Sequence, residues 1–440
     1  MKFILYPILT AFIFFNFSFY SCKAQSDFTK AETQNLHLKS SVDGLFWSGI
    51  TNHFSLTNDS SHLLIFTNGN AYLNCNTLPF SFTKNLVRSR FLDNTIKENA
   101  ASKIKNRNGA SFGYKYGAGF CTKKNKNSIG LEVSDESISV VNYRKDLFKL
   151  IFFGNAEFEN DTAYLSGINF ANQDFHRARF IFSTQSGTGD SSWQINASLS
   201  FLQGYHVNLL NTGLTTLFTA PMGEYLLLQS QLIYKTNDTS KSGTFAFNGN
   251  GISVDVCIAF PAGKSRLMFT INDAGFINWN KKSLYYGMDT TIKFEGVELE
   301  NILSNSGHEL GNINTDTILN YLGVYKGNDN FNLNLPLRFS LTWNKMISKN
   351  KIGLNAGFSL LPQYETVPLF FASATFFQKN LYPTLSVSYG GLQAFNMGIN
   401  LEGNFGSHFN FQLGTGQFLS LVFQKKLTGF NLFSQLSYSF

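Results

Sequence analysis

The chain has 440 residues, of which 16% are aromatic, with 47 phenylalanines, and only 14% are charged, well below the quarter that is typical of soluble domains. The formal net charge of +7 comes from scattered basic residues rather than from a basic stripe, which argues against nucleic-acid binding. Many aromatic residues, few charges and a mean hydropathy of −0.08 are typical of strands with one face to lipid and one to water.

The first residues predict export. Lys2 gives a positive start, Phe3–Tyr20 is largely apolar, and the small residues Cys22 and Ala24 stand two apart, as before a signal-peptidase cut. We predict a signal peptide over residues 1–24 and a single barrel domain over 25–440. Two alternatives stay open: an uncleaved anchor, because the apolar run is near the lower limit for a spanning helix, and lipidation of Cys22. No later apolar run is long enough for a membrane helix, which disfavours a helical membrane protein.

The N-terminal half combines one basic stretch with a series of candidate strands. Asn85–Asn108 carries many Lys and Arg with spaced Leu92 and Ile96, which predicts a short helix or a polar loop. Apolar and polar residues then alternate with the period of two that marks a half-buried strand. The candidate strands are Ala110–Phe120, Ile129–Val141, Phe148–Gly154, Arg177–Thr184, Trp193–Leu202, Glu224–Lys235, Ile252–Phe260 and Arg266–Asn272.

Val297–Asn330 interrupts this pattern. It is polar, with Leu and Ile spaced as in short amphipathic helices, so we predict a helical or irregular insertion that either enters the lumen as a plug or lies at the rim. About eight strands follow it. This even number would place the insertion at the same end of the barrel as Phe440, the periplasmic end.

The C-terminal half has the clearest strands. Every odd position of Phe331–Trp343 is apolar, and this run is long enough to cross a bilayer at a tilt. Pro336 lies within it and cannot donate to a ladder, so it marks a bulge or a strand end. Similar runs separated by short connections predict an antiparallel meander: they are Ile352–Leu360, Phe395–Glu402, His408–Leu413 and Phe430–Phe440.

Together these runs predict an all-β fold, a transmembrane antiparallel up-and-down β-barrel of about 14 strands, in a range of roughly 12 to 16. We prefer it to a soluble sandwich because the polar faces consist mainly of Asn, Ser, Gly, Gln and Thr and the apolar faces are large and aromatic. A terminal phenylalanine on an amphipathic strand, here Phe440, resembles the signal by which the outer-membrane assembly machinery recognises its clients. The expected partners are therefore membrane lipid and that machinery.

Four charged residues, Arg266, Asp255, Arg338 and Glu402, fall on polar strand faces. We predict that they face the lumen, because a charge facing lipid costs about 2–4 kcal/mol at the membrane midplane. There they either pair with each other or are solvated, or they line a selective pore. The acidic stretch Glu132–Glu136 lacks the spacing of a calcium loop, and we interpret it as a solvated strand edge or loop.

None of the seven histidines lies in a hydrolase or metalloprotease motif. Spacing for a zinc site is also absent among Cys75, Cys121 and Cys257. We therefore expect no enzymatic activity, no cofactor and no metal.

Two stretches resemble a family signature: Asp273–Asn280 (DAGFINWN) and Ile292–Leu299 (IKFEGVEL). Ser200–Gly204 and Gly251–Val256 are similar to further stretches of the same family, an uncharacterised outer-membrane barrel family of Bacteroidetes known as a domain of unknown function. The resemblance implies an outer-membrane barrel of the kind found in hydrophobic-substrate channels and secretion-associated barrels, and it implies no catalytic residues. The expected function is a channel for small or hydrophobic molecules. A structural or scaffold barrel in protein secretion or at the cell surface is the alternative, and a rim-active hydrolase has little support.

Overall fold

The structure, a computed structural model, describes residues 63–88, 91–186, 192–295, 322–347, 351–362, 367–406, 408–425 and 427–440. The predicted signal peptide with Cys22, and the part of the predicted insertion up to residue 321, lie outside the described residues.

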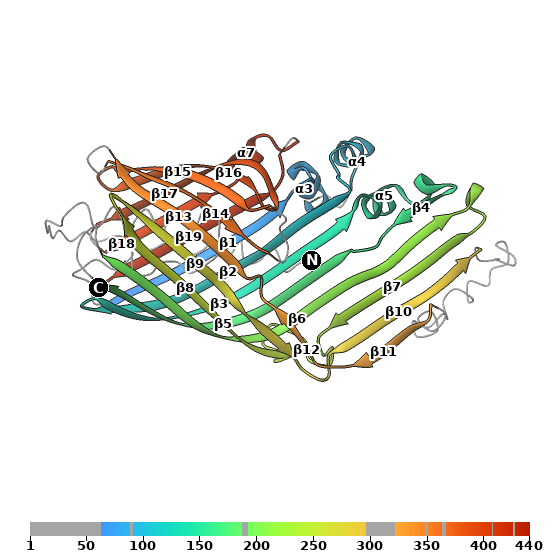
Figure 1. The fold of residues 1–440 in the computed structure, drawn as a ribbon, viewed down its shortest axis with the longest axis horizontal. Coiled ribbons are helices and arrows are strands. Elements are labelled where there is room, and N and C mark those ends of the chain that lie inside the picture. Colours follow the sequence, from blue (N-terminus) through green and yellow to red (C-terminus); the bar gives the residue numbers. More distant parts are fainter. Residues whose placement is uncertain are drawn as a thin grey trace.

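The described strands form one sheet that closes into a barrel (Figure 1). Each strand of the ring pairs antiparallel with the next, and the last pairs with the first from Leu64↔Ser439 to Leu73↔Phe430. The prediction of an up-and-down barrel of 14 strands is therefore confirmed. The ring strands are β1 (Leu63–Cys75), β2 (Arg107–Lys124), β3 (Asn127–Arg144), β5 (Asn169–Ser186), β6 (Trp193–Thr219), β8 (Gly249–Ala262), β9 (Ser265–Trp279), β13 (Arg338–Ile347), β14 (Ile352–Leu360), β15 (Leu369–Phe376), β16 (Leu381–Gly390), β17 (Gln393–Phe405), β18 (Phe409–Thr415) and β19 (Phe430–Ser439).

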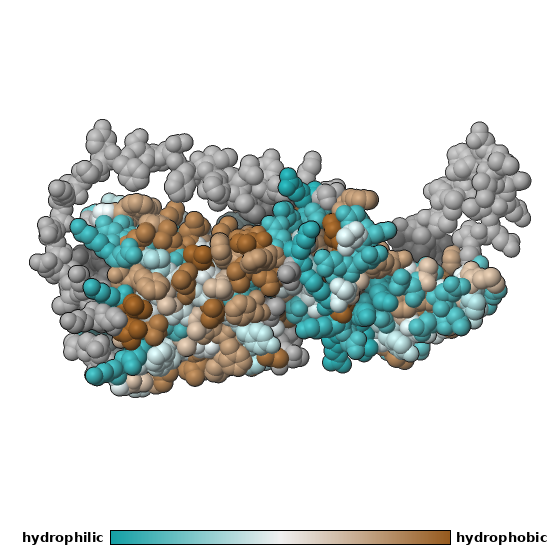
Figure 2. All heavy atoms as spheres, turned by 90° about the horizontal axis from the view of Figure 1, so that it is seen from above, coloured by the Kyte–Doolittle hydropathy of each residue, from teal (hydrophilic) through white to brown (hydrophobic). Residues whose placement is uncertain are grey.

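The outer face of the barrel carries an apolar band. On β6 the outward side chains of Trp193, Ile195, Leu199 and Phe201 are 40–53% exposed, whereas the polar side chains between them are buried inside. Figure 2 shows such apolar side chains gathered over the left part of the molecule, with hydrophilic side chains to the right of them. This arrangement follows from the period of two along a strand and is that of barrels that face lipid.

The two ends of the barrel differ. The end with Phe440 has tight turns, as at Asn125–Lys126 and Gly263–Lys264. The opposite end carries the helices of the described chain (Figure 1): α3 (Phe80–Arg88), α4 (Asn94–Ala101), α5 (Lys145–Phe153), η2 (Asn155–Phe158), η4 (Pro221–Gly223) and α7 (Phe418–Val422). Membrane barrels of bacteria have short periplasmic turns and longer outer loops, so this second end corresponds to the outer side.

The sheet continues beyond the barrel at this outer end. β6 has 27 residues, roughly 90 Å of extended chain at about 3.3 Å per residue. It pairs with β8 over Gln194–Gly204 and then with β7 over Asn208–Thr219. We call this part of the sheet the extension (Figure 1): it comprises the outer part of β6 with β4 (Asp161–Tyr164), β7 (Leu226–Thr236), β10 (Leu284–Phe294) and β11 (Val324–Asn328).

Three local predictions need comment. The predicted strand Phe148–Gly154 is wrong: Phe148–Phe153 belongs to helix α5, in which Phe148 packs on Phe82 and Phe152. Gly154, at φ 86°, ends this helix. Pro336, predicted to mark a bulge or a strand end, lies at a strand end: the ladder stops after β12 (Phe331–Asn334) and resumes at β13, so Phe331–Trp343 is two strands rather than one. In the tail of the predicted insertion, Val324–Asn328 is strand β11 rather than helical or irregular chain.

The predicted location of the insertion was wrong. The strands that flank it, β10 and β11, lie at the end opposite Phe440. Seven ring strands, β13 to β19, lie between the insertion and the C-terminus. Because this number is odd, the chain ends at the other side of the barrel. The sequence estimate was one strand too high.

Among the described residues, no helix is long and apolar enough to cross a bilayer. The membrane band can be tested on one strand, because β6 carries two exposed leucines, Leu199 in the band and Leu214 in the extension, at 44% and 53% exposure. We expect Leu199→Arg to lower the free energy of unfolding in lipid vesicles by about 2–4 kcal/mol, since arginine must leave water. Leu214→Arg should change it by less than about 0.5 kcal/mol. Equal losses in urea titrations of the two variants would contradict a lipid-facing band here.

Candidate functional site

Seven charged side chains meet inside the barrel and form what we call the ion network. They come from β2, β3, β5, β8 and β9, which lie in one half of the wall with β6 between β5 and β8. Lys115 links two carboxylates: its Nζ lies 3.0 Å from Glu132 Oε1 and 3.8 Å from Glu136 Oε1. The members are Lys115, Glu132, Glu136, Arg177, Arg179, Asp255 and Asp273.

Two buried arginines connect the carboxylates to the far strands. Arg179 Nη1 lies 2.8 Å from Glu132 Oε2, and its Nε lies 3.4 Å from Asp255 Oδ2. Arg177 Nη2 lies 3.0 Å from Glu136 Oε2 and 2.7 Å from Asp273 Oδ1. Both arginines are at most 2% exposed. Since an unpaired charge in this position would be costly, each guanidinium depends on its two carboxylates.

A β-bulge brings Asp273 into the network. Its φ is 58°, and the pairing of β8 with β9 shifts between Val254 and Val256. The backbone N–H of Asp273 donates to Asp255 Oδ1 at 2.7 Å. A bulge re-aims side chains, and here it turns the Asp273 carboxylate toward Arg177. The structure thus gives a physical role to the first residue of the DAGFINWN stretch.

An apolar group, the mouth cluster, lies between the ion network and the outer rim. On β5 the inner positions run from Arg179 and Arg177 to Phe175 toward the rim, and the Phe175 ring lies 5.5 Å from the Arg177 guanidinium carbon. Trp279 is fully buried at its centre. Gly204 leaves room for it, because a Cβ there would lie 2.6 Å from Trp279 Cη2. The members are Phe175, Leu202, Val207, Ile277, Trp279, Phe331 and Leu335.

The inner face of the extension continues outward from the mouth cluster. Val207 faces inward, and so does Leu209 two residues further along β6. Leu209 pairs with Lys235, and Lys235 pairs with Tyr285. Because paired residues share a face of the sheet, all of them lie on the inner face. Lys235 Nζ lies 5.4 Å above the Tyr285 ring and 5.1 Å above the ring of Phe331.

Tyr325 completes this surface. Its hydroxyl lies 3.2 Å from that of Tyr285, and its ring crosses Gly287, where a Cβ would lie 2.1 Å from Tyr325 Cζ. Tyr325 remains 54% exposed. We call Lys235, Tyr285 and Tyr325 the mouth platform, an aromatic and cationic surface above the barrel entrance.

The opposite half of the inner wall is polar but almost uncharged. Glu402 is the charged residue among its buried positions in the described chain, at 3% exposure. The side chains that are fully buried there include Ser359, Thr375, Thr384, Asn396 and Asn400. The buried side chains on both halves of the wall are therefore shielded from water in the described conformation.

Of the four predicted lumen residues, Asp255 is a member of the ion network. Asp255 accepts from Ser198 Oγ at 2.7 Å and pairs with Arg179. Arg338 is half-buried at the start of β13 and pairs with Asn272, the neighbour of Asp273 in the chain. Glu402 lies on the opposite wall. Arg266, half-buried, donates to the Ser192 carbonyl at 3.1 Å near the Phe440 end.

Sequence reasoning missed most of the network. The interpretation of Glu132–Glu136 as a solvated strand edge or loop was wrong: the stretch lies inside β3, and Glu132 and Glu136 are buried. The available signal was alternation. Glu132, Ser134 and Glu136 lie on one face of β3, and Arg177 and Arg179 lie on one face of β5. In the described residues, no group of three His, Cys, Asp or Glu is placed to hold a metal ion.

A closed barrel with an apolar outer band and a polar interior defines an outer-membrane-type β-barrel. Residues 61–416 match the family described as "Family of unknown function (DUF5723)", and the chain belongs to this family. No curated protein matches the chain.

Three distant solved structures are similar to the chain. A deltaS2S3 mutant of the TodX monoaromatic hydrocarbon channel has 8% identity and a TM-score of 0.46, with 88% of this chain and 92% of that chain covered. The toluene transporter TodX of P. putida has 9% identity and a TM-score of 0.44, with 88% and 91% covered. The translocator domain of the autotransporter NalP from Neisseria meningitidis has 8% identity and a TM-score of 0.34, with 93% and 99% covered.

Proposed function

We propose that the protein is a gated channel of the outer membrane, closed in the described conformation, for small molecules with an apolar or aromatic part. The observation that supports this most is the serial order of three surfaces toward the interior. A solute would first meet the mouth platform, then the mouth cluster, and then the ion network. The proposal includes no catalytic step.

Each surface suits one stage of such a passage. The exposed Tyr325 ring with Lys235 nearby offers stacking and cation–π contacts. The mouth cluster offers apolar contact but blocks the way while Trp279 and Phe175 fill it. Beyond it, the ion network would exclude an apolar solute unless the arginines separate from their carboxylates, so it is the inner gate.

A scaffold barrel is the second candidate. It is favoured by the complete burial of residues on both walls, such as Glu132 on one side and Asn400 on the other. In that case the extension would serve as a platform for a protein partner, and the barrel would only anchor it.

Conductance of a variant with a reduced mouth cluster separates the two. Phe175→Ala removes the ring of the mouth cluster that lies against Arg177 of the ion network. We expect a several-fold rise in single-channel open probability and in flux of a small aromatic solute into liposomes. Phe180→Ala is the matched control, because Phe180 lies on the same strand but faces outward at 52% exposure. It should conduct as little as the unchanged protein. A folded Phe175→Ala protein that passes no solute would overturn the channel proposal and support the scaffold.

A further inference from the structure

A polar cluster interrupts the apolar band on the outer wall at the level where β6 leaves the barrel. On β3, outward Val133 is 56% exposed, and the next outward residue toward the rim is Asp135, which is only 6% exposed. Asp135 Oδ1 lies 3.0 Å from His176 Nδ1. Tyr114 and Tyr205 each donate a hydroxyl hydrogen bond of 3.2 Å to the same carboxylate. A hydrogen-bonded carboxylate and imidazole therefore lie next to side chains that face lipid.

The loop between β7 and β8 covers this pair. His176 Nε2 donates to the Thr244 carbonyl at 2.8 Å, since that oxygen can only accept. The Phe245 ring lies 5.8 Å from the His176 ring. The loop is fixed at its end by Asn248, whose Nδ2 donates to the Tyr205 carbonyl at 2.8 Å and to the Lys241 carbonyl at 3.2 Å. These contacts hold the loop over the Asp135–His176 pair.

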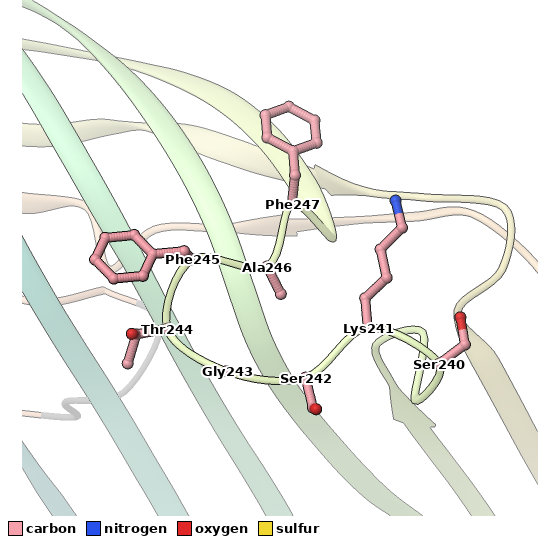
Figure 3. A pocket seen from close by; sticks show the side chains of 8 residues that line it. All are labelled: Ser240, Lys241, Ser242, Gly243, Thr244, Phe245, Ala246 and Phe247. Atoms are coloured by element: carbon pink, nitrogen blue, oxygen red, sulfur yellow. The ribbon is translucent and has the colours of Figure 1, made fainter.

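The cover carries two exposed phenylalanines beside polar residues. Phe245 is 88% exposed and Phe247 is 55% exposed. Both side chains point away from the loop backbone (Figure 3). They border a shallow surface hollow of about 670 Å³ formed by Ser240 to Phe247. Two such rings on one short loop would be unfavourable in water.

These rings lie at the edge of the apolar band that is nearer to the outer end of the barrel. Phe245 contacts His176, and His176 continues the outward row of Phe182 and Phe180 on β5. Tyr116, on the outer face of β2, is 50% exposed and stacks on Tyr114 at 5.7 Å. Aromatic girdles of this kind mark the membrane–water interface of barrels.

We propose that the Ser240–Phe247 loop is an interfacial lipid anchor, in which Phe245 and Phe247 insert among the acyl chains of the outer leaflet. The occupant of the hollow is thus a membrane lipid, and the loop shields the Asp135–His176 pair from it. The anchor holds β7 and the base of the extension at a fixed height on the membrane. It is independent of whether the lumen conducts.

Spin labels test the anchor directly. A nitroxide is attached to Phe245→Cys in the full-length protein in phospholipid vesicles, and power saturation compares its collisions with oxygen, which partitions into lipid, and with a water-soluble nickel chelate. Met222→Cys, at the tip of the extension and 85% exposed, is the matched control. Labelling of the unchanged protein, whose described cysteines are buried, gives the background.

We expect the Phe245 label to collide mainly with oxygen and the Met222 label mainly with the nickel chelate. Transfer of the same samples to lipid-free amphipathic polymer should remove the oxygen preference at Phe245 only in part, since the polymer chains replace lipid. A Phe245 label that is as accessible to the chelate in vesicles as the Met222 label would overturn the proposal. Neither result depends on channel activity, so the proposed function and the anchor fail separately.

Discussion

Replacing Arg177 by alanine is expected to lower the free energy of unfolding by about 3–5 kcal/mol, because it removes the buried cation that pairs with Glu136 and Asp273. Glu136 and Asp273 lie 3.0 and 2.7 Å from Arg177 Nη2, and their side chains are 7% and 17% exposed. Urea unfolding in vesicles, followed by tryptophan fluorescence, measures the loss. Arg177→Lys should lose less than alanine, since an ammonium keeps the charge but lacks the planar fork.

An exposed ion pair supplies the control for this variant. Lys149 Nζ lies 3.3 Å from Glu157 Oε2, with the two side chains 31% and 44% exposed. Lys149→Ala should change the free energy of unfolding by at most about 1 kcal/mol, because solvent already screens this pair. Similar losses for Arg177→Ala and Lys149→Ala would mean that the ion network is solvated, and the inner gate of the proposed channel would then have no basis.

The sequence predicts the barrel well because one local rule governs every ring strand. A period of two separates lipid-facing from inner side chains, and this pattern is strict in β14, whose bounds Ile352–Leu360 agree with the prediction. The same rule cannot tell where a strand pairs. Glu224–Lys235 alternates like a ring strand, yet β7 belongs to the extension. β7 pairs with the outer part of β6 because the β6–β8 pairing ends at Gly204, next to the bulge at Asp174/Phe175. Both features depend on pairing between strands and cannot be seen in the sequence of β7.

The ion network was missed for a related reason. A single strand shows only that Glu132 and Arg179 fall on polar faces, and solvation and pairing then fit equally well. Their contact of 2.8 Å depends on the register of β3 against β5 over the whole length of both strands. The helix α5 shows the opposite case, in which Phe148 leaves the strand period because its ring packs with Phe82 outside the barrel wall.

Loss of the Trp279 ring should be the most destabilising change in the mouth cluster. Trp279 is fully buried, and truncation of such an aromatic residue costs about 3–5 kcal/mol through lost contacts and the remaining cavity. Trp193→Ala is the control: Trp193 is 50% exposed on the outer face and stacks on Phe260 at 5.3 Å. It should lose clearly less in the same urea titration.

Gly204 allows a stricter test of the same packing. In the unchanged protein Gly204→Ala should be destabilising, because the new Cβ would lie 2.6 Å from Trp279 Cη2. In the Trp279→Ala background the ring is gone, so Gly204→Ala should have little effect or recover part of the loss. The double-mutant cycle should therefore show an interaction energy of about 0.5–3 kcal/mol, as expected for residues in contact. Additive effects would show that the ring does not lie against Gly204, and that the barrel mouth is closed by something other than the mouth cluster.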